Sequence, residues 1–196
     1  MTSTEKYYRD NANKFIEETL DKDMSIQYAL FEKYIPKPAS ILDAGCGSGR
    51  DSLYFKDKGY RVTAFDNSKQ MCKFAAELLD QEVLYLGFEE LELENKFDAV
   101  WASASLLHTS KEQMPEILRK LAHSLKDKGT MYASFKYGES EFIKEGRFFN
   151  AYTQESFAEL LKESLFTYVE TVVLPDTRPQ REDESWLNVI LSIDKS

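Results

Sequence analysis

The chain has 196 residues, of which 42% are apolar, and it carries a formal charge of −9 and two cysteines. This length is typical of one domain whose core carries the fold, and two cysteines are too few for a disulfide scaffold. The sequence shows no apolar run long enough for a membrane span or a secretory signal. We therefore expect a soluble, cytoplasmic protein, and its acidic balance argues against broad contact with phosphate backbones.

An amino-terminal arm, residues 1–38, is set apart from the rest of the chain by Pro36 and Pro38. Its apolar residues recur at steps of three and four, which predicts two helices separated near Leu20–Ser25. After the prolines the pattern changes, because short apolar runs rich in β-formers alternate with apolar stripes of helical spacing.

Five predicted strands alternate with helices beyond the arm, and two more strands follow a last helix. The predicted strands are Ser40–Asp43, Arg61–Asp66, Val83–Leu86, Phe97–Ala102, Thr130–Phe135, Phe166–Leu174 and Trp186–Ile193. Ser68 and Thr153 are expected to cap helices, because their hydroxyls can accept a hydrogen bond from an amide of the first turn. This order predicts an α/β fold with a mostly parallel sheet, helices on both faces and an antiparallel hairpin at the end.

The residues that best indicate a function are a glycine-rich turn and an acidic residue. Gly45, Gly47 and Gly49 follow the first predicted strand, and Asp66 ends the second. Both lie at the carboxyl edge of the predicted sheet, where ligands bind in such folds. Glycines let the main chain approach a ligand closely, and a carboxylate suits the vicinal hydroxyls of a ribose. This pair predicts an adenosine derivative as the ligand.

Spacing decides among three ligands of that kind. A nucleotide-triphosphate loop needs Lys followed by Ser or Thr after its last glycine, whereas Arg50 and Asp51 stand there. A dinucleotide fingerprint that begins at Gly45 needs glycine at position 50, and an acidic residue at position 51 fits poorly beside a pyrophosphate. Neither of these two ligands matches the pattern.

The remaining pattern, Asp-Ala-Gly-Cys-Gly-Ser-Gly over residues 43–49, resembles the first motif of the class I S-adenosylmethionine-dependent methyltransferases, in their small single-domain type 11/12 form. Residues 65–68 are similar to the acidic ribose motif of that family, and residues 97–102 and 129–133 to its later strand motifs. The resemblance covers at least residues 38–135. It implies S-adenosyl-L-methionine as the cofactor and S-adenosyl-L-homocysteine as the product.

The resemblance also implies a Rossmann-like three-layer sandwich with a seven-stranded sheet and an amino-terminal helical lid. We expect a single domain over residues 1–196, with residues 1–38 as the lid, 39–135 as the cofactor-binding core, and 136–196 as a substrate-side loop, helix and terminal hairpin. The residues implied for cofactor binding are Tyr8, Gly45, Cys46, Gly47, Arg50, Asp66, Asn67, Met71, Phe88, Glu89, Ala102 and Ser103. For Arg50 two roles stay open: a partner for the cofactor carboxylate, and an exposed ion pair with Asp51 or a neighbour.

Methyl transfer from a sulfonium needs alignment and exclusion of water more than it needs a base. In this architecture the residues after the fourth strand face the donor methyl, and His108 lies among them. An imidazole with a pKa near ~6.5 can accept a proton from a hydroxyl, an amine or a thiol, so His108 is the candidate catalytic base. The alternative, a histidine that hydrogen-bonds locally and fixes the loop, stays open.

Two segments, residues 136–152 and 176–185, leave the same edge of the predicted sheet and carry basic and aromatic side chains. In an acidic chain such a cluster suggests an acceptor that is anionic, planar or both, while ion pairs with nearby glutamates are the alternative. The candidate acceptor-binding residues are Tyr137, Arg147, Phe149, Arg178 and Arg181.

The leading hypothesis is a methyltransferase that acts on a small-molecule acceptor. A tRNA or protein methyltransferase is one alternative, and a non-catalytic regulatory protein that binds the cofactor is another, because a glycine turn serves binding and catalysis alike. We expect no metal, no membrane and no nucleic-acid partner, and a monomer or a homodimer.

Overall fold

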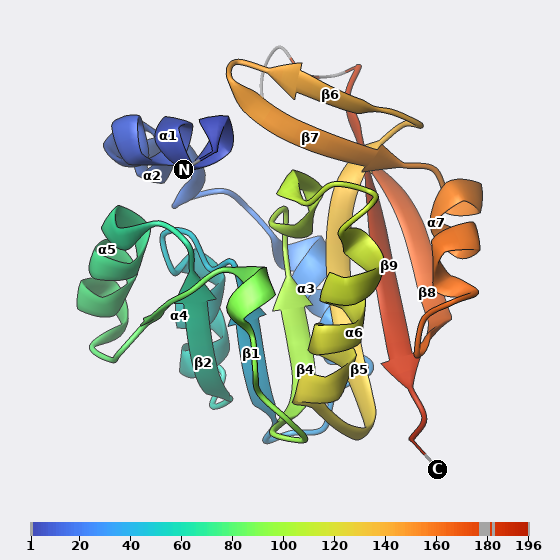
Figure 1. Cartoon of the computed structure of the whole chain (residues 1–196). Helices are drawn as coiled ribbons and strands as arrows, with labels where there is room; N and C mark the ends of the chain where they lie inside the picture. Colours follow the sequence, from blue (N-terminus) through green and yellow to red (C-terminus); the bar gives the residue numbers. More distant parts are fainter. Residues whose placement is uncertain (1, 177–180, 182, 196) are drawn as a thin grey trace.

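A mixed sheet forms the centre of the molecule, as the computed structural model shows for residues 2–176, 181 and 183–195 (Figure 1). Nine strands belong to it within the described residues. They are β1 (Ser40–Ala44), β2 (Arg61–Asp66), β3 (Leu84–Tyr85), β4 (Phe97–Ala102), β5 (Leu125–Tyr137), β6 (Glu141–Lys144), β7 (Arg147–Tyr152), β8 (Phe166–Pro175) and β9 (Ser185–Ile193).

Strand order and direction match the predicted class. The strands β3, β2, β1, β4 and β5 lie side by side and run parallel. The strand β9 pairs antiparallel with β5 and with β8, so the last two strands form the expected hairpin. The α/β class with a carboxyl-terminal antiparallel hairpin is confirmed.

Helices cover both faces of the sheet, with α6 and α7 in front and α3 behind in Figure 1. The helices are α1 (Ser3–Asp10), α2 (Ala12–Thr19), α3 (Ser25–Glu32), α4 (Arg50–Asp57), α5 (Lys69–Leu79), α6 (Met114–Ser124) and α7 (Gln154–Leu161), with the short 3-10 turns η1 (Phe88–Glu90) and η2 (Leu106–His108). Ser68 accepts from the amide of Met71 and Thr153 from the amide of Ser156, so both predicted caps are confirmed.

Successive side chains of a strand point to opposite faces of the sheet, so a hydrophobic core forms on each face. Ile41 and Trp101 point to one face of the sheet, where they pack with α3 and α4. Leu42 and Val100, their chain neighbours, point to the other face and pack with α6 and α7. Burial on both faces explains why the central strands are nearly continuous apolar runs.

The predicted count of seven strands is wrong, because residues 141–152 form a hairpin where the sequence suggested a loop. The strands β6 and β7 pair antiparallel, and β7 joins the end of β5 through only two residue pairs. Glu145 and Gly146 both have positive φ, 52° and 75°, as a type I′ hairpin turn requires. The glutamate at the first turn position hides this signal, since Asn or Asp is usual there.

The arm holds three helices rather than the two expected. Asn11 interrupts the first one, with φ −121° and ψ 19°, and its side-chain amide donates to the carbonyl of Tyr7. The helices α1 and α2 lie over the carboxyl end of the central strands, beside the β6–β7 hairpin (Figure 1). In the described part of the chain, no helix has both the length and the apolar character to cross a membrane.

Candidate active site

A cavity of about 340 Å³ opens at the carboxyl edge of the parallel strands. Its walls come from the glycine turn after β1, the end of β2, the segment from β4 to η2, the arm, and the ends of β5, β7, β8 and β9. The cavity therefore lies where a doubly wound sheet places its ligand.

The glycine turn can be built only from glycine at its first position. Gly45 has φ +79°, and a Cβ added there would lie 2.5 Å from the Cβ of Ser105. Ser105 cannot move away freely, because its hydroxyl donates to the carbonyl of Ala44 at 2.6 Å. The close approach keeps this part of the cavity wall as bare main chain.

Asp66 joins the end of β2 to the glycine turn. Its carboxylate accepts hydrogen bonds from the amide of Gly47 at 2.9 Å and from the amide of Ser68 at 2.8 Å. Burial raises the pKa of Asp66, and these amides act in the opposite direction. A carboxylate held in this way lines the cavity with its position fixed before any ligand binds.

Arg50 lines the cavity and forms an ion pair with Asp51, which is largely buried rather than exposed. Its Nε lies 2.6 Å from Asp51, and its Nη1 donates to the carbonyl of Thr19 at 2.9 Å. Asp51 also accepts from the indole of Trp101 at 2.8 Å and from the hydroxyl of Tyr28 at 2.5 Å. Burial acts to raise the pKa of Asp51, but the Arg50 charge and these donors outweigh it, so the carboxyl stays ionised.

Tyr8 on α1 and His108 in η2 form a hydrogen-bonded pair. The Nδ1 of His108 lies 2.6 Å from the carbonyl oxygen of Phe148, and since a carbonyl only accepts, Nδ1 carries the proton. The Nε2 of the neutral ring then accepts from the hydroxyl of Tyr8 at 2.8 Å. Burial lowers the pKa of His108 to about 4 and raises that of Tyr8 to about 12. Both groups are therefore uncharged at neutral pH.

Further contacts attach the arm to the wall of the cavity. The amide of Phe148 donates to the hydroxyl of Thr4 at 2.9 Å, and the guanidinium of Arg147 lies 4.3 Å from the ring centre of Tyr7. The ring of Tyr8 packs edge-on against Phe15 of α2, with centroids 5.1 Å apart. The arm thus contacts β7 and η2 and forms one side of the cavity.

The structure brings nearly all the predicted cofactor residues to this cavity. Those that line it are Tyr8, Gly45, Cys46, Gly47, Arg50, Asp66, Asn67, Met71, Phe88, Glu89 and Ser103. Ala102 is the exception, because it is fully buried and packs into the core on the α6 face of the sheet.

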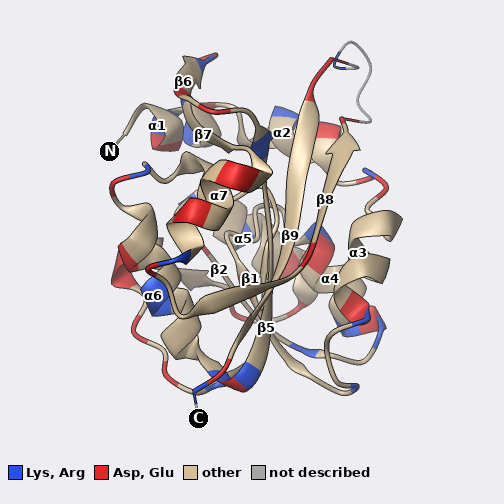
Figure 2. Ribbon diagram, turned by 90° about the vertical axis from the view of Figure 1, so that its right-hand side faces the viewer, with Lys and Arg blue, Asp and Glu red and all other residues tan. Residues whose placement is uncertain are grey.

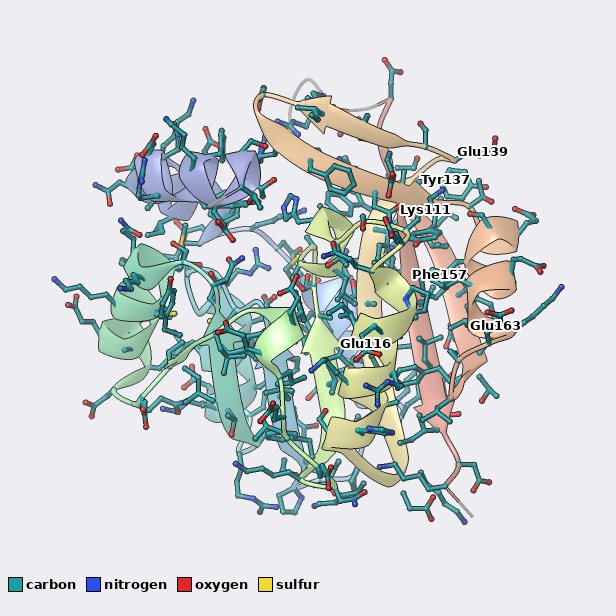
Figure 3. The ribbon with its side chains drawn as sticks, in the orientation of Figure 1. Lys111, Glu116, Tyr137, Glu139, Phe157 and Glu163 are labelled. Atoms are coloured by element: carbon teal, nitrogen blue, oxygen red, sulfur yellow. The ribbon has the colours of Figure 1, made fainter. Side chains whose placement is uncertain are left out.

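Among the predicted acceptor residues, Arg147, Phe149 and Arg181 line the cavity, and Arg178 lies outside the described residues. Tyr137 does not line it. Its side chain is 41% exposed and lies near Glu139, on the side of the molecule away from α1 (Figure 3). Adjacent strand residues point to opposite faces of the sheet, so its chain neighbour Lys136 lines the cavity instead.

The sequence places Lys136 in a basic segment at this edge, but it does not reveal the polar wall that alternate residues of β5 and β9 form. Tyr132, Ser134 and Lys136 lie two residues apart on β5, and Trp186 and Asn188 do so on β9. The polar residues inside an otherwise apolar strand are the signal, since a polar side chain at a core position needs a partner or a ligand.

Comparison with known proteins agrees with the geometry. Residues 41–129 match the family model described as "Methyltransferase domain". An uncharacterized methyltransferase of Staphylococcus carnosus (strain TM300) is 29% identical over 159 residues, which cover 77% of this chain and 75% of that protein. The malonyl-[acyl-carrier protein] O-methyltransferase of Buchnera aphidicola subsp. Baizongia pistaciae is 33% identical over 121 residues, 60% of this chain and 48% of the relative.

Among solved structures, the 1,6-didemethyltoxoflavin-N1-methyltransferase of Burkholderia thailandensis superposes with a TM-score of 0.80, at 24% identity over 97% of this chain and 85% of that one. That structure holds 1,6-didemethyltoxoflavin and S-adenosylhomocysteine. The fold, the family model and the relatives all agree with the motif over residues 43–49. Together the family model over residues 41–129 and these relatives support a class I S-adenosylmethionine-dependent methyltransferase of the small type.

Proposed function

We propose that this protein transfers the methyl group of S-adenosylmethionine to a small-molecule acceptor bound in the same cavity. The observation behind this proposal is that one continuous cavity contains both the wall assigned to the cofactor and a wall suited to an acceptor. One wall is the glycine turn with Asp66, and another includes Phe149 and Trp186. Donor and acceptor can lie together in this space, as a displacement at the sulfonium methyl requires.

Within the cavity we assign the cofactor to the wall formed by the glycine turn and Asp66, which the sequence motif and the fold both indicate. The main chain of Gly45 and Gly47 would face the methionine part, Asp66 would accept from the ribose hydroxyls, and Met71 and Phe88 would flank the adenine. The Tyr8–His108 pair would border the donor methyl. The bound cofactor supplies the electrophilic methyl, and the protein positions the acceptor and keeps water out.

The cavity, about 340 Å³ in volume, must hold the cofactor as well as the acceptor, which favours an acceptor of small-molecule size. The names of the relatives agree on the reaction class but not on the acceptor. The Burkholderia protein is named for 1,6-didemethyltoxoflavin, a small molecule, and the Buchnera protein for malonyl-[acyl-carrier protein]. For this reason the proposal names a class of acceptor and no compound.

A macromolecular acceptor is the less favoured alternative. Figure 2 shows acidic and basic residues interspersed along the elements in view, and the chain carries a net charge of −9. Binding of RNA draws mainly on clustered Lys and Arg. Neither feature supports a surface for nucleic acid.

The experiment uses cofactor labelled in the methyl group and a cell extract that ultrafiltration divides into small molecules and macromolecules, with the macromolecules then divided into protein and nucleic acid by phenol extraction. We expect label to enter the small-molecule fraction only. Label in RNA or protein would overturn the small-molecule assignment. Tight binding of the cofactor without transfer to any fraction would favour the regulatory alternative.

A further inference from the structure

Building on the function proposed above, we propose that the methyl acceptor carries an anionic group, of the size of a carboxylate or an ionised ring atom, and that Arg147 binds it. Arg147 begins β7 and lies in the cavity wall, with 9% of its side chain exposed. A guanidinium keeps its charge at any physiological pH, and burying that charge is costly unless an anion accompanies it.

The protein supplies only a weak counter-charge for Arg147. The partner is Glu145, 2.7 Å from Nη2, and its side chain is 55% exposed. Water screens an ion pair with so exposed a carboxylate, and such pairs contribute little. Much of the positive charge of Arg147 is therefore felt inside the cavity.

Two other cations of the cavity wall, Arg50 and Lys136, are neutralised by buried partners. Arg50 pairs with Asp51, whose side chain is 9% exposed. Lys136 pairs with Asp176, whose side chain is fully buried. Arg147 differs from both, because its carboxylate partner lies at the exposed hairpin turn.

Geometry holds the guanidinium of Arg147 in place. It lies 4.3 Å from the ring centre of Tyr7 and 5.3 Å from that of Phe149. Its Nε is buried and has no hydrogen-bond partner among the described residues. One donor of Arg147, its Nε, is thus not used by the described part of the protein, while Nη2 pairs with Glu145, the guanidinium interacts with the hydroxyl of Tyr8, and the two rings hold its orientation.

The groups next to Arg147 suit an anion. The hydroxyl of Tyr8 and the ring of His108 are both uncharged, and they are already bonded to each other. Of the four described acidic residues that line the cavity, Asp51 is paired with Arg50, Glu5 accepts from the amide of Thr2, and Asp66 accepts from the amides of Gly47 and Ser68. The fourth, Glu89, lies in η1, on the wall assigned to the cofactor. Where the ionised atom of the acceptor is itself the nucleophile, no proton leaves on methylation and no base is needed.

The test uses protein saturated with S-adenosylhomocysteine and pairs of planar probes that differ only in charge: benzoate with benzamide, and nicotinate with nicotinamide. Affinities are measured by ligand-observed NMR. We expect wild type to bind each anion roughly tenfold more tightly than its amide, as a charge-assisted contact would give. R147Q should abolish that preference, and R147K should retain part of it.

The controls separate this inference from the proposed function. E145Q removes the exposed partner and should strengthen anion binding or leave it unchanged. Calorimetry with S-adenosylhomocysteine should give affinities within about twofold for all variants, because Arg147 is assigned to the acceptor. Equal affinities of wild type for anion and amide, or an R147Q variant that keeps the preference, would overturn the inference. Failure of wild type to bind S-adenosylhomocysteine would instead overturn the proposed function.

Discussion

The hydroxyl of Tyr8 donates a 2.8 Å hydrogen bond to Nε2 of His108, across a separation of 100 residues in the chain. The other ring nitrogen of His108 is bound to the carbonyl of Phe148. Both nitrogens of the imidazole are therefore occupied. We expect His108 to hold Tyr8 in position rather than to collect a proton from the acceptor, so the local structural role left open by the sequence is the one that we favour.

Stability at low pH tests the environment of His108. The unfolded state takes up a proton below about pH 6.5, whereas the folded state, with the pKa lowered to about 4 by burial, does not do so until near pH 4. Wild type should therefore lose up to about 3 kcal/mol of unfolding free energy over that interval, and H108Q should not lose this part. Urea unfolding at about pH 7.5 and about pH 4.5 measures the difference.

The matched control is H123Q, since His123 lies on an exposed part of α6. It should lose stability at low pH as wild type does. If H108Q and wild type showed the same loss, the buried neutral imidazole would be refuted.

Removal of the Tyr8 hydroxyl should loosen the arm. Y8F keeps the ring that packs on Phe15 but leaves Nε2 of His108 without its donor, at a cost of about 1–3 kcal/mol. We expect faster amide hydrogen exchange in α1, while exchange in α6 stays unchanged, because the loss is local. Y7F, which keeps the ring that faces Arg147, is the control and should exchange as wild type does.

Replacement of Asp66 should weaken cofactor binding. D66A removes two oxygens expected to accept from the ribose, and also the partner of the Gly47 amide. A lost charged acceptor corresponds to about 2–3 kcal/mol, or roughly 30- to 150-fold in affinity for S-adenosylhomocysteine by calorimetry. D57A, at an exposed position of α4, should bind as wild type does. An unchanged affinity in D66A would show that the ribose assignment is wrong.

Two glycine substitutions separate backbone strain from steric conflict. Gly59 has φ +89° and open space where a Cβ would lie, so G59A should cost about 1–2 kcal/mol of stability from backbone conformation alone. Gly45 has a similar φ, but its Cβ would collide with Ser105. We expect G45A to destabilise by more than G59A and, unlike G59A, to abolish binding of S-adenosylhomocysteine. Similar losses in both variants would contradict the close approach.

Local signals explain how much of the fold the sequence reveals. The alternation of strands and helices and the caps at Ser68 and Thr153 depend on short-range propensity, so they can be read directly. The glycine turn and Asp66 can also be recognised in the sequence, because close approach and hydrogen bonding restrict the residue types at these positions. These features place one half of the site.

The other half depends on contacts between distant segments. Nothing near Arg147 in the sequence shows that α1 will cover it. Which of the neighbours Lys136 and Tyr137 points into the cavity depends on the orientation of β5 in the sheet. The pairing of Tyr8 with His108 likewise depends on where the arm folds back. Such features need the tertiary structure.

The hairpin of β6 and β7 offers a way for acceptor specificity to differ among related proteins. It pairs with β5 through two residue pairs, yet it brings Arg147 and Phe149 into the cavity wall, on a segment separate from the glycine turn and Asp66. Mutations or insertions in this hairpin can therefore change the acceptor specificity while the residues assigned to the cofactor stay the same. Grafting the hairpin between relatives is a practical route to exchange their selectivity.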